Sequence, residues 1–151
     1  ILGEGAQRPS LEALADRLGV RDRIDMPGFV RHPGPMFRMA DLFVLSSDYE
    51  GFGNVVVEAL EQGTPVVSTD CPSGPSEILE DGRYGKLVSM GDIDALAHAI
   101  QEALSRTHDH AALKRRAQDF SIDRAADAYL DLLLPGWRSL QSNGWQDREN
   151  V

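Results

Sequence analysis

The chain has 151 residues, of which 42% are hydrophobic and 26% are charged, a composition that is ordinary for one globular domain with a sizeable core. Its formal net charge of −9 argues against nucleic acid and against an anionic membrane as main partners, because an acidic surface is drawn to neither. The single cysteine, Cys71, excludes an internal disulfide framework and fits a reducing compartment.

No stretch approaches the ~18 consecutive apolar residues of a membrane helix, and no signal-peptide pattern opens the sequence. We therefore expect a cytoplasmic protein. The sequence starts at Ile1 without a methionine, within or at the end of what reads as a strand. From this we expect a fragment or an excised domain.

The first elements are short. Gly3-x-Gly5 lacks the third glycine of a dinucleotide-binding loop, so it predicts a plain loop before a helix over residues 11–18. Ser10 is the expected N-cap of this helix, and Gly19 is expected to close it. A short strand over 24–26 and a short helix over 35–40 are expected to follow.

The middle of the chain reads as strand, glycine-rich turn and helix. Residues 41–47 form a short run of bulky apolar residues ended by small polar ones, as in a buried strand. Asn54 is a good helix N-cap, residues 55–62 are apolar around most of the helix surface, and Gly63 and Pro65 are stop signals.

The later elements continue this alternation of strands and helices, which predicts an α/β fold with a parallel sheet. We expect strands over 66–68 and 86–88, a helix over 93–104 capped by Asp92, and helices around 111–120 and 122–134. From Pro135 the pattern dissolves, and residues 135–151 read as an extended tail.

The most informative segment is residues 50–58, where Glu50 and Glu58 bracket a glycine-rich turn that opens into a helix. In a parallel sheet such a loop lies at the carboxyl ends of the strands, where open α/β folds bind ligands. A helix start offers unpaired N–H groups to a diphosphate, and carboxylates accept hydrogen bonds from sugar hydroxyls. Without side chains, Gly51 and Gly53 let the backbone approach a ligand. This pattern predicts a nucleotide-sugar pocket.

Three simpler interpretations stand beside this one. Either glutamate alone is explained by the helix dipole or by solvation of a loop. Asp92-x-Asp94 has the spacing of a cation site, but its place at a helix start is explained by capping, so we predict no metal site. The basic run 114–116 occupies one helical turn and is expected to form a solvated face.

Residues 50–58 resemble the E-x7-E motif of retaining GT-B glycosyltransferases of the GT4 type. The resemblance extends through the strand before the motif, the helix and strand after it, and the loops over 70–78 and 81–88, so that it covers residues 1–134. It implies a Rossmann-like three-layer parallel sheet that forms the C-terminal half of a GT-B fold. Residues 1–134 would then be a nucleotide-sugar donor-binding domain, followed by the tail.

The resemblance also assigns roles to residues. It implies that Glu50 faces the donor sugar as the catalytic carboxylate and that Glu58 binds the ribose hydroxyls. The remaining positions are implied to bind the sugar and diphosphate, at Gly51, Phe52, Gly53, Asn54 and Val55, and to line the base, at Gly28, Phe29, Val30 and Arg31. The loop over 72–77 is expected to border the same cleft, with the role of Glu77 left open.

The implied activity is metal-independent transfer of a hexose or N-acetylhexosamine, with retention, from a nucleotide-diphosphate sugar to a glycan or lipid-linked acceptor. UDP is the favoured nucleotide because Pro72-Ser73-Gly74-Pro75 resembles the family members that use UDP sugars. No cofactor is expected. Members of the family bind the acceptor with an N-terminal domain, and any association with the inner face of the membrane is made through that domain as well. This domain is expected to be missing here, so we expect the isolated chain to be inactive.

Two alternatives remain open: a non-catalytic module that binds a nucleotide sugar or a partner, and another GT-B enzyme such as a UDP-sugar epimerase. In the family the terminal helices cross back to the N-terminal domain. For that reason Trp137 and Trp145 are expected to lack their packing partner here.

Overall fold

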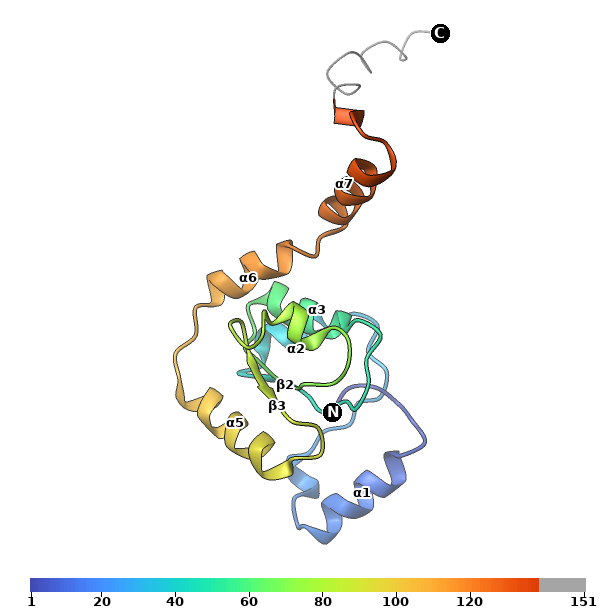
Figure 1. The fold of residues 1–151 in the computed structure, drawn as a ribbon. Helices are drawn as coiled ribbons and strands as arrows, with labels where there is room; N and C mark the ends of the chain where they lie inside the picture. The colour runs from blue at the N-terminus through green and yellow to red at the C-terminus, as the bar shows by residue number, and fades with distance from the viewer. Residues whose placement is uncertain (139–151) are drawn as a thin grey trace. The chain divides into compact units, whose positions relative to one another are not determined.

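The computed structural model describes residues 1–138, which form two compact units, Ile1–Met36 and a second unit that begins at Phe37 (Figure 1). Each unit is described by itself. Within residues 1–138 no helix is both long enough and apolar enough to cross a membrane.

The first unit contains α1 (Arg8–Arg17) and a short 3-10 helix, η1 (Arg21–Arg23). The predicted cap at Ser10 is wrong: α1 begins earlier, with Pro9 in its first turn, where the fixed φ of proline suits a helix. The predicted closure at Gly19 is confirmed by its positive φ of 66° and its N–H bond to the carbonyl of Asp16.

The strand predicted over 24–26 is not formed. Pairing in this unit is limited to one parallel bridge between Leu2 and Gly28 and to the Ile1 amino group, which donates to the carbonyl of Asp25. A strand exists only where a neighbour continues the ladder, and here the pairing with residues 1–3 amounts to a single bridge.

The second unit is built on a parallel sheet. In the part of the chain that the structure describes, the strand order is β1 (Phe43–Leu45), β2 (Val66–Thr69), β3 (Lys86–Val88). Phe43 pairs with Val66, and Val67 pairs with Lys86. The predicted strands are therefore confirmed, although β1 is shorter than the apolar run that predicted it.

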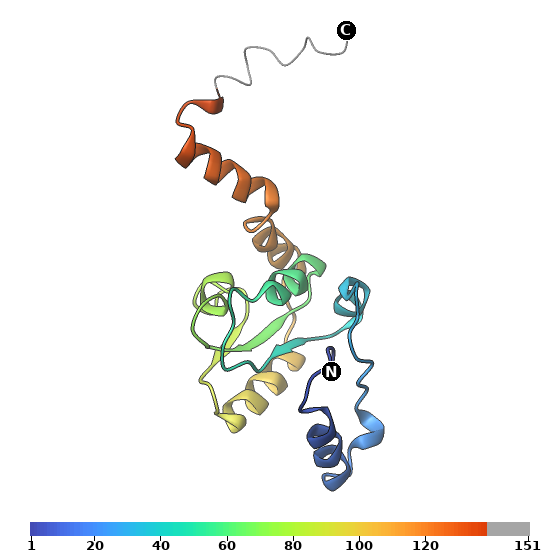
Figure 2. The same cartoon turned by 90° about the vertical axis from the view of Figure 1, so that its right-hand side faces the viewer.

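Helices cover both faces of this sheet, as Figure 2 shows for α3 on one side and α5 on the other. Successive residues of a strand point to opposite faces, and the two cores follow that rule. Val66 belongs to one core with residues of α3 (Asn54–Gln62), α4 (Pro75–Ile78) and α6 (His110–Gln118). Val67 belongs to a second core with Val88 and residues of α5 (Ile93–Ser105). This confirms the predicted α/β fold with a Rossmann-like three-layer arrangement.

The remaining helices are α2 (Gly34–Met39), which crosses the boundary between the units, and α7 (Ile122–Leu133). Asp92 caps α5, as predicted, by accepting the N–H of Ala95 at 2.8 Å. α7 has no buried residue and keeps its apolar side chains exposed, among them Tyr129 and Leu132.

The expectation that Trp137 lacks a packing partner is wrong. Its indole is 9% exposed, and its Nε1–H donates to Asp131 of α7 at 2.7 Å. The guanidinium of Arg138 lies 4.9 Å from the ring centroid of Trp137. The last turn of α7 thus supplies the partner locally. Trp145 and the rest of the predicted tail beyond residue 138 lie outside the described residues.

Candidate functional site

The predicted site lies where β1 and β2 end, at what we call the carboxyl edge of the sheet. The segment that follows β1 is held there by Thr69, the last residue of β2, whose buried hydroxyl donates to the carbonyl of Ser47. The hydroxyl of Ser47 in turn donates to Oε1 of Glu50 at 2.7 Å. Because the two strands are parallel and adjacent, the end of one fixes the loop that leaves the other.

Residues 51–53, the glycine turn, lead from this loop into α3. The predicted cap at Asn54 is wrong: Gly53 is the N-cap, with a φ of 86°, and α3 starts at Asn54 itself. A glycine provides no capping side chain, and the N–H groups of Asn54 and Val55 donate to no acceptor within residues 1–138. The start of α3 therefore presents the unpaired donors and the positive dipole end that suit an anionic ligand.

Residues 72–75, the proline loop, pack directly on the glycine turn. Gly74 has a φ of 95°, and a Cβ built on it would lie 1.7 Å from the carbonyl oxygen of Phe52. Only glycine can occupy this position without moving one of the two loops. Its neighbour Ser73 also has a positive φ, 68°, which is uncommon for a residue with a side chain. The loop over 72–77, which was predicted to border the same cleft as the glycine turn, therefore makes a direct backbone contact with that turn.

The two carboxylates of the motif have different surroundings. Both are half-buried. Glu50 accepts the hydroxyl of Ser47, whereas the side chain of Glu58 makes no hydrogen bond or ion pair with any residue in the described part of the chain. A half-buried carboxylate without a protein partner has its acceptor oxygens available to hydroxyl donors of a ligand.

The residues predicted to line a base lie in the first unit. Gly28 has a φ of 82° and its carbonyl accepts the N–H of Gly3 at 2.8 Å. Phe29 is 79% exposed, Val30 is half-buried and Arg31 is exposed. Within residues 1–138 the guanidinium of Arg31 makes no ion pair or hydrogen bond, so its donors are also available.

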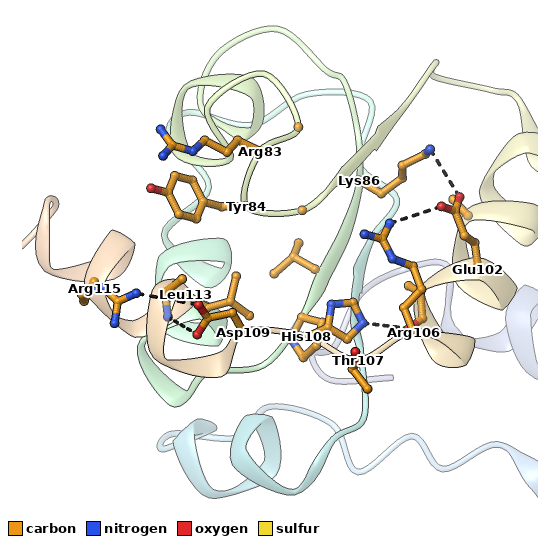
Figure 3. A pocket seen from close by; sticks show the side chains of 17 residues that line it. Arg83, Tyr84, Lys86, Glu102, Arg106, Thr107, His108, Asp109, Leu113 and Arg115 are labelled. Atoms are coloured by element: carbon orange, nitrogen blue, oxygen red, sulfur yellow. Dashed lines mark hydrogen bonds and ion pairs between the residues drawn. The ribbon is translucent and has the colours of Figure 1, made fainter.

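A cavity of about 710 Å³ lies at the other end of the strands, where β2 and β3 begin. We call it the amino-edge cleft. Figure 3 shows its polar side chains, which come from the start of β3, the end of α5 and the segment that leads into α6. None of the predicted site residues lines it. The labelled residues are Arg83, Tyr84, Lys86, Glu102, Arg106, Thr107, His108, Asp109, Leu113 and Arg115.

The charges of the amino-edge cleft already have partners in the protein. Lys86 and Arg106 both contact the carboxylate of Glu102, at 3.4 and 3.3 Å, and Arg115 lies 3.8 Å from Asp109. The Lys86 ammonium, which hydrogen-bonds Glu102, is the main reason that the pKa of this carboxyl lies below its usual range, and Arg106 adds to the effect. Across residues 1–138 no group of three or more His, Cys, Asp or Glu side chains could hold a metal ion.

The family model for glycosyl transferases group 1 matches residues 1–120. The chain belongs to this family. The match includes the motif over 50–58, the proline loop and both carboxylates, so the resemblance drawn from those residues is confirmed.

Individual relatives agree with the family model. The chain is 38% identical, over 138 residues, to the lipopolysaccharide core biosynthesis glycosyltransferase LpsE of Rhizobium meliloti, and covers 40% of that relative. Among solved structures it is similar to the apo lipopolysaccharide outer core galactosyltransferase WaaB (TM-score 0.79, 24% identity, 88% of this chain and 39% of that one). It is also similar to HepE of Anabaena in complex with UDP (TM-score 0.66, 29% identity, 82% of this chain and 35% of that one). These neighbours are GT-B glycosyltransferases, and the chain spans about two fifths of the length of the relatives.

Sequence reasoning missed the residues that hold the site together. Arg116 was expected on a solvated face, but its side chain is only 15% exposed and donates to the carbonyls of Glu77 and Ile78. Phe120, beyond the end of α6, packs edge-on against Phe52 of the glycine turn at 5.6 Å. A helical period could have placed Arg116 on the same face as the buried Leu113 and Ala117, which was the available signal.

Proposed function

We propose that this chain is the donor-binding domain of a retaining, metal-independent glycosyltransferase. It would bind a nucleotide-diphosphate sugar, with UDP favoured, for transfer of a hexose or N-acetylhexosamine to a glycan or lipid-linked acceptor. The observation that carries the proposal is the glycine turn at the carboxyl edge. There, two unpaired N–H groups at the start of α3 adjoin a motif with two half-buried carboxylates.

The chemistry of the turn fits such a donor. A diphosphate matches the N–H groups of Asn54 and Val55 and the positive end of the α3 dipole. Glu58, which has no partner in the described protein, is suited to the ribose hydroxyls, and Glu50 to the sugar. In transfer, charge builds up on the departing diphosphate, and fixed N–H donors that meet it there stabilise the transition state. Residues 1–134 would form the donor-binding domain. The residues that would line the nucleotide base are Gly28, Phe29, Val30 and Arg31.

The similar proteins support the choice of nucleotide, donor sugar and acceptor. The HepE structure contains UDP, which favours UDP as the nucleotide. WaaB is a galactosyltransferase and LpsE acts in lipopolysaccharide core biosynthesis, which favours a hexose donor and a glycan or lipid-linked acceptor. The acceptor would be bound outside these residues, and any contact with the membrane surface would be made outside them as well. The location that we propose is cytoplasmic.

The test is a calorimetric titration of the chain with UDP, UDP-N-acetylglucosamine, UDP-galactose and GDP-mannose, repeated on Glu58→Ala. Saturable binding of one nucleotide family, weakened roughly tenfold or more in Glu58→Ala because charged hydrogen bonds are lost, is the expected result. Glu61→Ala is the matched control, because Glu61 is an exposed glutamate of the same helix. Equal weakening by both substitutions would contradict the assignment of Glu58.

Transfer activity separates the enzyme from a binding module. With the full coding chain, we expect release of UDP from the donor in the presence of acceptor, and we expect Glu50→Gln to lower its rate roughly a hundredfold or more. Tight donor binding without any transfer would favour a non-catalytic module. Interconversion of two UDP sugars without acceptor would favour an epimerase.

A further inference from the structure

One arginine of α6 links the two loops of the candidate site. The basic run of α6 contains Lys114, Arg115 and Arg116, and the last of these differs from its neighbour. The side chain of Arg115 is 66% exposed and reaches only Asp109, whereas that of Arg116 is 15% exposed. A guanidinium that is this far buried needs hydrogen-bond acceptors within the protein. The acceptors of Arg116 therefore indicate its structural role.

The partners of Arg116 lie at the end of α4. Its Nε donates to the carbonyl of Ile78 at 2.9 Å, its Nη2 to the carbonyl of Glu77 at 2.6 Å, and its Nη1 to Asp119 at 2.9 Å. The three nitrogens of one planar guanidinium thus donate to two successive carbonyls of α4 and to the carboxylate of Asp119. α4 begins at Pro75, directly after Gly74, so a clamp on its last carbonyls also fixes the proline loop.

The same guanidinium is connected to the glycine turn through the aromatic ring of Phe120. It lies 4.6 Å from the centroid of Phe120 and 5.6 Å from that of Tyr84. Phe120 packs edge-on against Phe52, the central residue of the glycine turn. Phe52 in turn meets Gly74 through its carbonyl oxygen. The contacts therefore close a circuit from Arg116 through α4 and the proline loop to the glycine turn, and back through Phe120.

We propose that Arg116 is a positioning residue for the donor: it holds the proline loop and the glycine turn in register, so that the N–H groups of Asn54 and Val55 point at the diphosphate. This inference rests on the proposed function. The N–H groups belong to the first residues of α3, directly after the glycine turn, and small displacements of such donors weaken both binding and catalysis. Lysine cannot replace the arginine, because a single ammonium cannot serve two carbonyls and a carboxylate in the planar geometry of the fork.

The test compares Arg116→Lys with Arg115→Lys in the full coding chain, by steady-state kinetics with donor and acceptor varied in turn. Arg116→Lys should raise the KM for the donor by roughly fivefold to tenfold while the KM for the acceptor stays unchanged. Arg115→Lys should change neither. Phe120→Leu, which keeps an apolar side chain but removes the ring that joins Arg116 to Phe52, should also raise the donor KM.

Thermal melting of each variant separates positioning from general stability. If Arg116→Lys only reduced the fraction of folded enzyme, kcat per total protein would fall and both KM values would stay as they are, which would overturn the inference. An unchanged donor KM in well-folded Arg116→Lys would overturn it as well. If the unsubstituted chain bound no nucleotide sugar at all, the proposed function would fail first, and this inference with it.

Discussion

The two edges of the sheet in the second unit differ in what they leave unpaired. The amino-edge cleft has a volume of about 710 Å³ and several charged side chains, yet its cations and carboxylates neutralise one another, since Lys86 and Arg106 both contact Glu102. The carboxyl edge carries the two carboxylates of the motif, Glu50 and Glu58. It keeps a half-buried Glu58 without a protein partner and a helix start whose N–H groups have no acceptor within the described residues.

This difference shows why the presence of a cavity alone is a poor guide to a ligand site in this protein. A charged ligand entering the amino-edge cleft would have to compete with ion pairs that already exist. A ligand at the carboxyl edge would satisfy groups that the fold has left open, and desolvating an unsatisfied group costs more than a lost ion pair at the surface contributes. The following predictions test this contrast, beginning with the largest expected effect.

Gly74→Ala should have the largest effect, because its Cβ would collide with the carbonyl of Phe52 while the backbone keeps a φ of 95°. We expect a loss of about 2 to 4 kcal/mol in the free energy of unfolding, measured by urea titration, together with loss of nucleotide binding. Gly91→Ala is the control, since Gly91 also has a positive φ, 74°, but open space around its Cβ. It should cost roughly 1 kcal/mol and leave binding intact. Equal effects of the two substitutions would show that the loop contact is unimportant.

Glu50→Gln and Glu102→Gln compare a glutamate at each edge. Glu50→Gln keeps the size of the side chain but removes the charge that would face the donor sugar, and we expect kcat of the full coding chain to fall by roughly a hundredfold or more. Glu102→Gln breaks the two ion pairs of the amino-edge cleft and should leave kcat within twofold, since exposed ion pairs contribute little. A large loss of activity in Glu102→Gln would place function at the wrong edge for our proposal.

Thr69→Val and Thr64→Val form a second matched pair, because both hydroxyls are buried and donate to a backbone carbonyl. Thr69 donates to the carbonyl of Ser47 at the carboxyl edge. Thr64, which precedes β2, donates to the carbonyl of Phe37. Each substitution should lower the free energy of unfolding by about 1 kcal/mol. Only Thr69→Val should also weaken nucleotide binding, severalfold, because it releases the loop that carries Glu50. Calorimetry on both variants distinguishes the local effect from the general one.

The sequence predicted what depends on local patterns. The three strands, the helices α3, α5, α6 and α7 and the cap at Asp92 follow from apolar periodicity and from stop and start signals, which act over a few residues. The candidate carboxylates also came from local context, a strand followed by glycines and a helix start. The strand predicted over 24–26 failed because strand formation depends on a neighbour that no local pattern reveals.

The site's supporting contacts could not be predicted for the same reason. Arg116 meets the carbonyls of Glu77 and Ile78 across 38 or more positions of sequence, and Phe120 reaches Phe52 across a still longer separation. A basic run in a helix carries no sign of which carbonyl it will bind. The error at Asn54 has a different origin: both Gly53 and Asn54 suit an N-cap, and the positive φ of 86° just before α3 favours the glycine.

The smallest expected effect concerns acid stability at the amino-edge cleft. Glu102 has a lowered pKa, mainly through Lys86, so its ion pairs stabilise the fold above the usual glutamate value of about 4.3 and lose their contribution as the pH falls through the lowered value. Lys86→Met should move the pKa of Glu102 back toward the usual value, which an NMR titration of its side-chain carboxyl carbon can follow. Arg106 remains in place, so the return should be partial. Nucleotide binding at neutral pH should not change in Lys86→Met; if it did, the two edges would be coupled through β2 and β3, and the contrast between them would have to be given up.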